Sequence, residues 1–128
     1  MYELEKNAKQ YWDFILDLRN DSRVKAGFIQ QHHIKEKEHY KYMKSFGENF
    51  YICLDKGEPV GYIGIISDDI RVATHPDHRG KGVAKFMVNE MTALHPAAVA
   101  KVKIENEASL RLFKSCGFVK KYYILEKE

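Results

Sequence analysis

Cysteine is scarce in this sequence, and long apolar segments are absent. The two cysteines, Cys53 and Cys116, each lie in an apolar stretch and do not form a close pair, which argues against a disulfide framework and a cysteine-rich metal centre. No apolar run approaches the roughly 20 residues of a membrane span, and Met1 to Gln10 is too polar for a signal peptide. We therefore expect a cytoplasmic protein with no metal ion and no membrane partner.

Charge of one sign is not in large excess either. The 128 residues include 21 Lys and Arg against 18 Asp and Glu, for a net charge of +3, which is too small to indicate nucleic-acid binding. Hydrophobic residues make up 45% of the chain, enough for one buried core. Internal repeats, low-complexity segments and linkers are absent. We expect a single domain over residues 1–128.

Apolar periodicity predicts a mixed α/β domain. A helix over Gly82–Leu94 separates two predicted strands, so these strands should be parallel. Gly61 and Gly64 predict that other groups pack closely against their strand. Strands are expected at Met1–Asn7, Asn49–Leu54, Val60–Ser67, Asp69–Ala73, Ala97–Ile104 and Phe118–Leu125. Helices are expected at Lys9–Arg19, Lys35–Phe46, Gly82–Leu94 and from Asn106 to Gly117, with a loop or short helix at Arg23–Ile34.

The segment Asp69–Met87 is organised like a binding site for phosphate groups. A helix begins near its end, and a helix N-terminus presents unpaired N–H groups and the positive end of the helix dipole. Gly80 and Gly82 allow a ligand to approach the backbone closely. Positive charge comes from Arg79, Lys81 and Lys85. These features together suit a pyrophosphate.

Two standard phosphate-binding motifs are missing from this turn. There is no G-x-x-x-x-G-K-S/T Walker sequence and no G-x-G-x-x-G dinucleotide-binding sequence. A Gly-x-Gly before a helix is also common in a purely structural turn. The turn by itself does not decide between these alternatives.

Two segments resemble signatures of the GNAT N-acetyltransferases, a family that binds acetyl-coenzyme A. Arg79–Ala84 resembles the family's Q/R-x-x-G-x-G/A signature, and Val72 and Pro76 match positions that usually precede it. Asn106–Phe118 resembles the family's N-x-x-S/A-x-x-L/F-Y-x-x-x-G-F helix. The resemblance covers the chain from about Val60 to Phe118.

This resemblance implies the GNAT fold: a mixed central sheet with an antiparallel N-terminal meander and a splayed parallel strand pair, flanked by about four helices. It also implies acetyl-CoA as cofactor. The pantetheine arm would lie along Val72, Ala73 and Thr74. The pyrophosphate would lie on Arg79, Gly80, Lys81, Gly82, Val83 and Ala84, with Asn106 and Phe113 contacting the cofactor from the opposite side.

Acetylation of an amine requires a base, because the amine must lose its proton before it attacks. The family commonly uses a carboxylate on the strand before the phosphate turn, which makes Asp69 the first candidate and Glu105 the second. His75 is a third candidate by its ordinary pKa. Each has an alternative structural role, as a solvated charge or a turn residue.

Phe113 departs from the family pattern, which usually has a tyrosine there as general acid. Phenylalanine has no proton to donate. The thiolate then leaves unassisted, or Tyr122 or Tyr123 substitutes, or the protein binds acyl-CoA without catalysis. A thiolate is a reasonable leaving group, since an unperturbed Cys thiol has a pKa of about 8.5, so activity is compatible with Phe113.

The segment around Arg19 resembles two GNAT subgroups, one acting on nucleotide-linked amino sugars and one on protein N-termini such as those of ribosomal proteins. The acceptor would then lie near Arg19, Asn20, Arg23 and His39. The alternative is that Asn20 and Asp21 only cap a helix. We favour a small-molecule amine on a nucleotide-linked sugar, with the protein acting as a monomer or homodimer.

Overall fold

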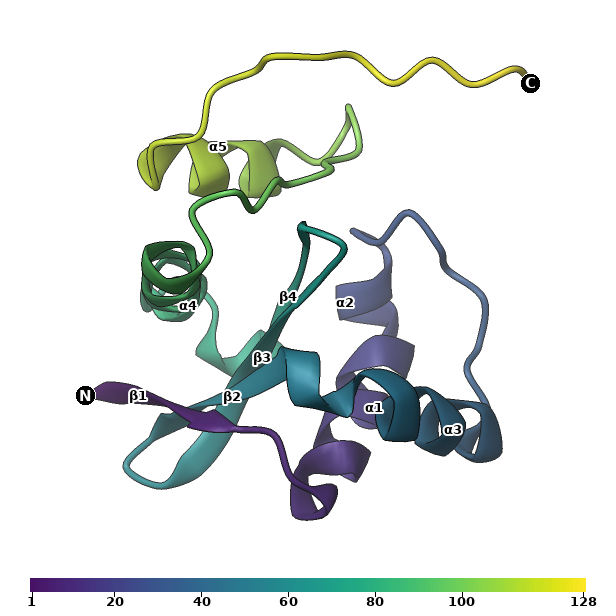
Figure 1. Ribbon diagram of the computed structural model, residues 1–128, viewed down its shortest axis with the longest axis vertical. Helices are drawn as coiled ribbons and strands as arrows, with labels where there is room; N and C mark the ends of the chain where they lie inside the picture. The colour runs from purple at the N-terminus through teal and green to yellow at the C-terminus, as the bar shows by residue number, and fades with distance from the viewer.

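Four strands form one antiparallel sheet in the computed structural model, which describes all residues from Met1 to Glu128 (Figure 1). Each strand pairs with the next along the chain, so the sheet order is β1-β2-β3-β4. The strands are β1 (Tyr2–Lys6), β2 (Phe50–Asp55), β3 (Glu58–Ile66) and β4 (Asp69–Thr74). The predicted N-terminal strand and antiparallel meander are therefore confirmed.

Helices cover both faces of this sheet (Figure 1). One face packs against α1 (Trp12–Asn20), α2 (Ser22–Lys25) and α3 (Glu36–Phe46), and the other against α4 (Val83–Leu94). α5 (Glu107–Ser115) packs on α4. Single-turn helices occur at Lys9–Tyr11, Gly47–Asn49 and Pro76–His78. The α/β class is confirmed, and no helix is long and apolar enough to span a bilayer.

The sheet separates two buried clusters, because successive side chains of a strand point to opposite faces. Ile63 and Met87 lie in the cluster on the α4 side, and Ile15 and Phe50 lie in the cluster on the α1 side. A Cβ on Gly61 would lie 2.8 Å from the Met87 methyl carbon, and one on Gly64 would lie 2.5 Å from the Phe50 ring. The close packing predicted at both glycines is confirmed.

The strand predicted over Ala97–Ile104 is wrong except at one residue. Val99 forms a parallel bridge with β4, in which Ile70 N donates to Val99 O at 2.9 Å and Val99 N donates to Asp68 O at 2.7 Å. Beyond Val99 the backbone forms no bridge to β4, and the side-chain amine of Lys103 donates to the carbonyl of Ala26 at 3.3 Å. The parallel pairing is thus a single bridge, and the sheet itself is antiparallel.

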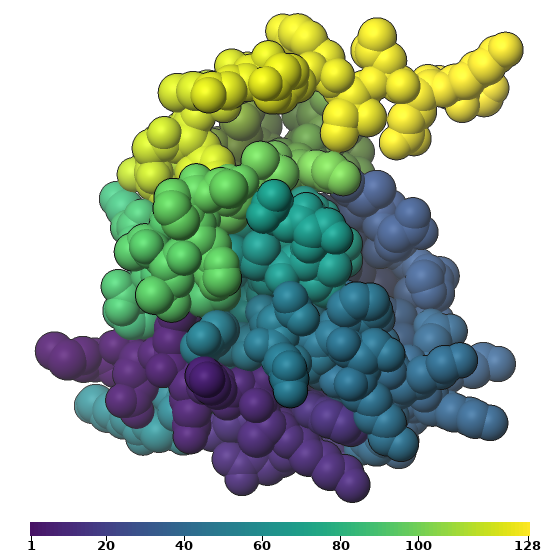
Figure 2. All heavy atoms as spheres, viewed as in Figure 1, coloured from purple at the N-terminus to yellow at the C-terminus, as the bar shows by residue number.

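The strand predicted over Phe118–Leu125 is also not formed. This segment runs extended above α5 (Figures 1 and 2), and every residue from Val119 to Glu128 is exposed. Its alternating pattern suits a strand, but a strand requires a partner to satisfy its backbone groups. The neighbouring segment that would have supplied one, Ala97–Ile104, is itself not a strand.

Candidate active site

Two adjoining hollows open beside β4, one of about 660 Å³ and one of about 390 Å³. We call them the larger and the smaller hollow. They share Gly27, Phe28, Val72, Asn106 and Ser109, so they adjoin along these residues, and we refer to the two together as the cleft. Of the residues predicted to hold the cofactor, Val72, Ala73, Thr74, Arg79, Gly80, Gly82, Val83, Ala84 and Asn106 line the larger hollow, Phe113 lines the smaller one, and Lys81 lines neither.

One edge of β4 faces the larger hollow without a strand partner. The amide of His75 bonds across to β3, and the amide of Ile70 points the opposite way, to Val99. Since backbone groups alternate sides along a strand, Val72 and Thr74 point their amides to the same side as Ile70. The Thr74 hydroxyl is buried without a partner. The edge therefore offers backbone amides to an extended ligand.

The turn after β4 has the geometry of an anion site. Gly80 and Gly82 have φ of 76° and 81°, and nothing lies within 4 Å of a Cβ built on either. Gly82 caps α4, and its carbonyl accepts a main-chain hydrogen bond from Phe86 N at 3.0 Å. The amides before Phe86 are the unpaired donors of a helix N-terminus. The turn is held from outside by Tyr2, whose hydroxyl donates to Lys81 O at 2.9 Å.

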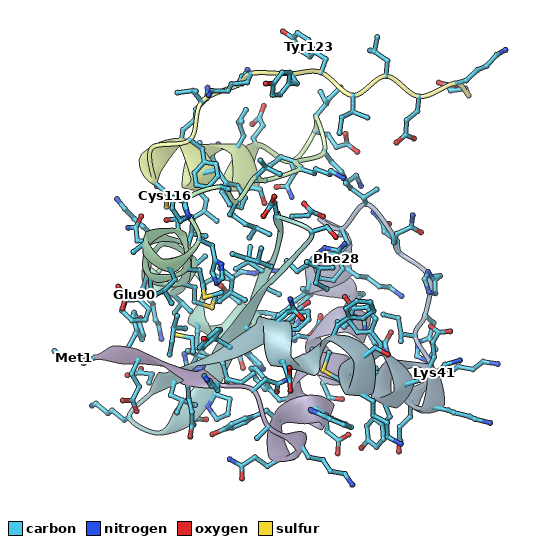
Figure 3. The ribbon with its side chains drawn as sticks, in the orientation of Figure 1. Met1, Phe28, Lys41, Glu90, Cys116 and Tyr123 are labelled. Carbon is cyan, nitrogen blue, oxygen red and sulfur yellow. The ribbon has the colours of Figure 1, made fainter.

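A segment in which sequence patterns marked only Arg23 as functional spans the cleft. This bridging segment, Arg23–Phe28, comprises most of α2 and the residues after it. Its carbonyls accept hydrogen bonds from both sides of the larger hollow: Arg79 Nη2 to Arg23 O at 2.6 Å, Lys103 Nζ to Ala26 O at 3.3 Å, and Asn106 Nδ2 to Gly27 O at 3.5 Å. Phe28, the last residue of this segment, lines both hollows (Figure 3). Only Gly27, an isolated glycine, signalled such a close approach.

Asn106 begins α5 as the sequence predicts. Its Oδ1 accepts a hydrogen bond from Ser109 N at 3.1 Å, which satisfies one of the free amides of the helix start. The side-chain nitrogen points to the bridging segment, so a Cβ on Gly27 would lie 2.9 Å from it. Asn106 therefore joins a helix cap to the wall of the cleft.

Asp69 lies at the start of β4 and lines the smaller hollow. Its side chain is 17% exposed, and Arg71 Nε donates to its Oδ2 at 3.1 Å. The other oxygen, Oδ1, is buried and has no hydrogen-bond partner. A buried carboxylate oxygen without a donor is energetically costly. Oδ1 has almost no accessible surface, so a donor in the hollow reaches it only if the Asp69 side chain turns.

The sequence matches the model of the acetyltransferase (GNAT) family over residues 12–118. The chain belongs to the GNAT acetyltransferase family. Its enzyme class is therefore acyltransferase. No curated protein sequence matches this GNAT chain.

Solved structures share the fold of this GNAT domain. Spermidine N-acetyltransferase from Vibrio cholerae, in complex with CoA and spermine, is 18% identical with a TM-score of 0.84, covering 98% of this chain and 85% of that one. A domain from Methanocaldococcus jannaschii is 21% identical with a TM-score of 0.83, over 94% and 90%. Ribosomal-protein-alanine N-acetyltransferase from Brucella melitensis is 15% identical with a TM-score of 0.76, over 90% and 83%.

Of the other two candidate bases, Glu105 lines the larger hollow and His75 lines neither hollow. Glu105 is 73% exposed and pairs with Lys103 at 3.4 Å. A hydrogen bond from its own backbone amide, with a further one from Lys103, lowers the pKa of Glu105, so this carboxylate is a weak base. His75 accepts from Asp77 N at 3.1 Å and caps the short helix that follows, which is the structural role left open for it.

Phe113 is buried and lines the smaller hollow, with its ring centroid 5.2 Å from that of Phe118. Tyr122 and Tyr123 are 89% and 90% exposed and lie on the extended C-terminal segment, away from the cleft (Figure 3). They are not placed to replace a hydroxyl at Phe113. The smaller hollow is instead lined by two tyrosines that no sequence pattern singled out, Tyr42 and Tyr62, and burial raises the pKa of each.

The predicted acceptor residues divide between lining and supporting positions. Arg19 lines the smaller hollow and Arg23 the larger one. Asn20 and His39 line neither: Asn20 exchanges two hydrogen bonds of 2.8 Å with the backbone of Ile34, and His39 is fully buried. Both residues therefore lie outside the lining, and His39 reaches the cleft only through Arg19. Asp21 accepts from Arg23 N at 2.8 Å, so the capping alternative is confirmed for that residue.

Proposed function

We propose that this protein is an acetyl-CoA-dependent N-acetyltransferase that transfers the acetyl group to a primary amine by direct attack on the thioester. The unpartnered edge of β4 at Val72 and Thr74 carries this proposal, together with the Arg79–Ala84 turn that follows after the short Pro76–His78 helix. An extended amide-bearing arm pairs with a strand edge, and a pyrophosphate binds free amides at a helix start. The two lie in the order in which coenzyme A presents them.

Acetyl-CoA, when bound, supplies the activated acyl group. Val72 and Thr74 would hold the pantetheine arm, while Gly80, Gly82 and the start of α4 would hold the pyrophosphate, with Arg79 adding charge. Asp69 is the one carboxylate that lines the smaller hollow, so it would bind the acceptor ammonium there and remove its proton, after a turn of its side chain that brings the unpartnered Oδ1 to the ammonium. Phe113 would exclude water from the reaction site and has no proton to donate.

The acceptor we favour is a nucleotide-linked amino sugar. The family includes subgroups acting on such sugars and on protein N-termini, and the basic residues of the cleft suit a nucleotide diphosphate. The second candidate is acetylation of a protein N-terminus. Phe113 motivates a third, a non-catalytic acyl-CoA-binding module.

Thermal denaturation with acetyl-CoA tests the cofactor, since a ligand of the native state at 100 times its Kd adds about 2.7 kcal/mol of stability. We expect the Tm to rise, and Arg79→Glu to abolish the rise. Release of free thiol from acetyl-CoA over a panel of amines, including UDP-linked amino sugars and peptide N-termini, then tests catalysis. A rise in Tm with no release from any amine supports the binding module, and no rise in Tm contradicts both.

A further inference from the structure

The smaller hollow has an unbalanced positive charge. Its lining includes the cations Arg19, Arg71 and Lys101 but a single carboxylate, Asp69. Arg71 is paired with Asp69 at 3.1 Å, whereas neither Arg19 nor Lys101 has a carboxylate within 4.0 Å. Two positive charges therefore face this part of the cleft without a counter-ion from the protein.

Arg19 is held in place by neutral groups only. Its Nη1 lies 2.9 Å from His39 Nδ1, and its guanidinium carbon lies 4.7 Å from the centre of the Tyr42 ring. The other ring nitrogen, His39 Nε2, lies 2.7 Å from Trp12 O. A carbonyl only accepts, so Nε2 carries the proton and Nδ1 is the acceptor for Arg19. This pattern of bonds requires His39 to be neutral.

A half-buried guanidinium with neutral partners keeps its full charge while losing part of its hydration. The hydrogen bond and the ring fix its direction, which lowers the entropy cost of binding an anion. Planar guanidinium groups bind carboxylates and phosphates through paired hydrogen bonds. Arg19 therefore has the properties of a preorganised anion receptor on the acceptor side of the cleft.

We infer that the acceptor is a small primary amine that also carries an anionic group, a carboxylate or a phosphate, which binds Arg19 while its ammonium binds Asp69. This inference rests on the proposed function and specifies its acceptor. His39 is a positioning residue: it orients Arg19 and does not touch the acceptor. Lys101 adds long-range attraction for the same anion.

The charge of the hollow sets this chain apart from a polyamine acetyltransferase. The Vibrio cholerae structure contains spermine, a ligand with positive charges only. Arg19 and Lys101 repel the distal ammonium groups of such a chain, and no second carboxylate lines the hollow to bind them. Similarity of fold thus does not extend to the acceptor.

Calorimetric titration of amines into the protein saturated with CoA tests this inference, because CoA carries no acyl group and no reaction occurs. The probes are β-alanine for the carboxylate, 2-aminoethyl phosphate and a UDP-linked amino sugar for the phosphates, ethanolamine for an uncharged amine, and spermidine. We expect at least one anionic probe to bind at least tenfold more tightly than ethanolamine, and spermidine to bind most weakly. Comparing which anionic probes bind shows whether the acceptor carries a carboxylate or a phosphate.

Variants assign the preference to Arg19. Arg19→Gln should reduce the anionic advantage at least tenfold and leave the Tm rise with acetyl-CoA unchanged. Lys41→Gln is the matched control: it removes one positive charge from an exposed site on α3, outside both hollows (Figure 3), and should preserve the preference. His39→Leu should reduce the preference for anionic amines as Arg19→Gln does. His39→Gln keeps one donor and one acceptor, so it should bind anionic amines with the preference of the unmodified protein.

Three results overturn the inference: equal binding of anionic and uncharged amines, absence of binding by every anionic probe, or tightest binding by spermidine. An anionic preference that persists in Arg19→Gln also overturns the role of Arg19. Each of these is distinct from failure of the proposed function, which is the absence of a Tm rise with acetyl-CoA in the unmodified protein.

Discussion

At the scale of single residues, two carboxylates near the cleft differ in their fitness as a base. Asp69 is 17% exposed with one oxygen lacking a partner, whereas Glu105 is 73% exposed and bound to Lys103. We expect Asp69→Asn to lower kcat by about 10²–10⁴, the usual contribution of a general base, with little change in acetyl-CoA affinity. Steady-state kinetics beside cofactor titration measure both. Glu105→Gln is the control, and a larger loss there than in Asp69→Asn would reverse the assignment.

His39 makes the stability of the protein depend on pH. Burial, with the charge of Arg19, lowers the pKa of His39 below its ordinary value of 6.5, against opposing effects of the Trp12 carbonyl and Asp13; Tyr40 is the other titratable group beside its ring. Between the lowered value and 6.5 the unfolded chain binds more protons than the folded one. The free energy of unfolding should therefore fall as the pH drops below 6.5.

Urea denaturation above and below pH 6.5 measures this dependence. His39→Gln should lose the part of the pH dependence that belongs to the buried ring, because glutamine makes similar hydrogen bonds without titrating. His95→Gln, at an exposed position, should retain it. Identical pH profiles for the unmodified protein and His39→Gln would contradict a neutral, buried His39.

At the scale of elements, the turn before α4 can be compared with a second tight turn that has the same backbone geometry but lies outside the cleft. Gly82 and Gly57 have nearly the same φ, 81° and 82°, and no atom lies within 4 Å of a Cβ on either. Only Gly82 lies in the cleft. Alanine at either position should cost about 1–2 kcal/mol of stability, from the strain of a left-handed backbone.

We expect Gly82→Ala, but not Gly57→Ala, to weaken acetyl-CoA binding as well, because it disturbs the free amides at the start of α4. Denaturation curves give the stability of each variant, and calorimetric titration gives its affinity for the cofactor. Equal affinities in the two variants would remove the turn from the pyrophosphate site.

At the scale of the whole molecule, the last residues contribute little to the folded state. Residues 119–128 are exposed throughout and form no strand. Removing residues 120–128 should change the free energy of unfolding by less than about 0.5 kcal/mol, as for other surface changes, and leave turnover intact. Thermal melts and the thiol-release assay check this. A large loss of stability would mean that this segment has a partner in solution, and a loss of turnover alone would implicate Tyr122 or Tyr123.

The sequence predicted the site better where chemistry is local than where it depends on tertiary contacts. The Arg79–Ala84 turn and the Asn106 cap follow from glycine dihedrals and short-range hydrogen bonds, and both are present as expected. The hydrogen bonds by which the bridging segment Arg23–Phe28 spans the cleft were missed, because they join residues more than 50 positions apart. The burial of His39 was not predicted, because a histidine on a mixed Lys/Glu helix gives no sign of burial until α1 is packed against it.

The same contrast between local pattern and tertiary contact explains why the two predicted strands are absent. The alternation in Ala97–Ile104 and Phe118–Leu125 is typical of strands, but a local pattern does not say whether the edge of another strand is close enough to pair with. Val99 alone meets β4, and the side chain of Lys103 is directed to Ala26 instead.

The single bridge at Val99 has a consequence for amide hydrogen exchange. Segments that open independently exchange faster than the cooperative core. The polypeptide after Val99 makes no main-chain hydrogen bond to the sheet and joins the core through apolar contacts, including those of Phe113. We expect α5 amides to exchange faster than those of β2 and β3 in the free protein. Acetyl-CoA should slow exchange at Val72, Thr74 and α5 together, so that the ligand, acting as a fifth strand, merges two exchange units into one.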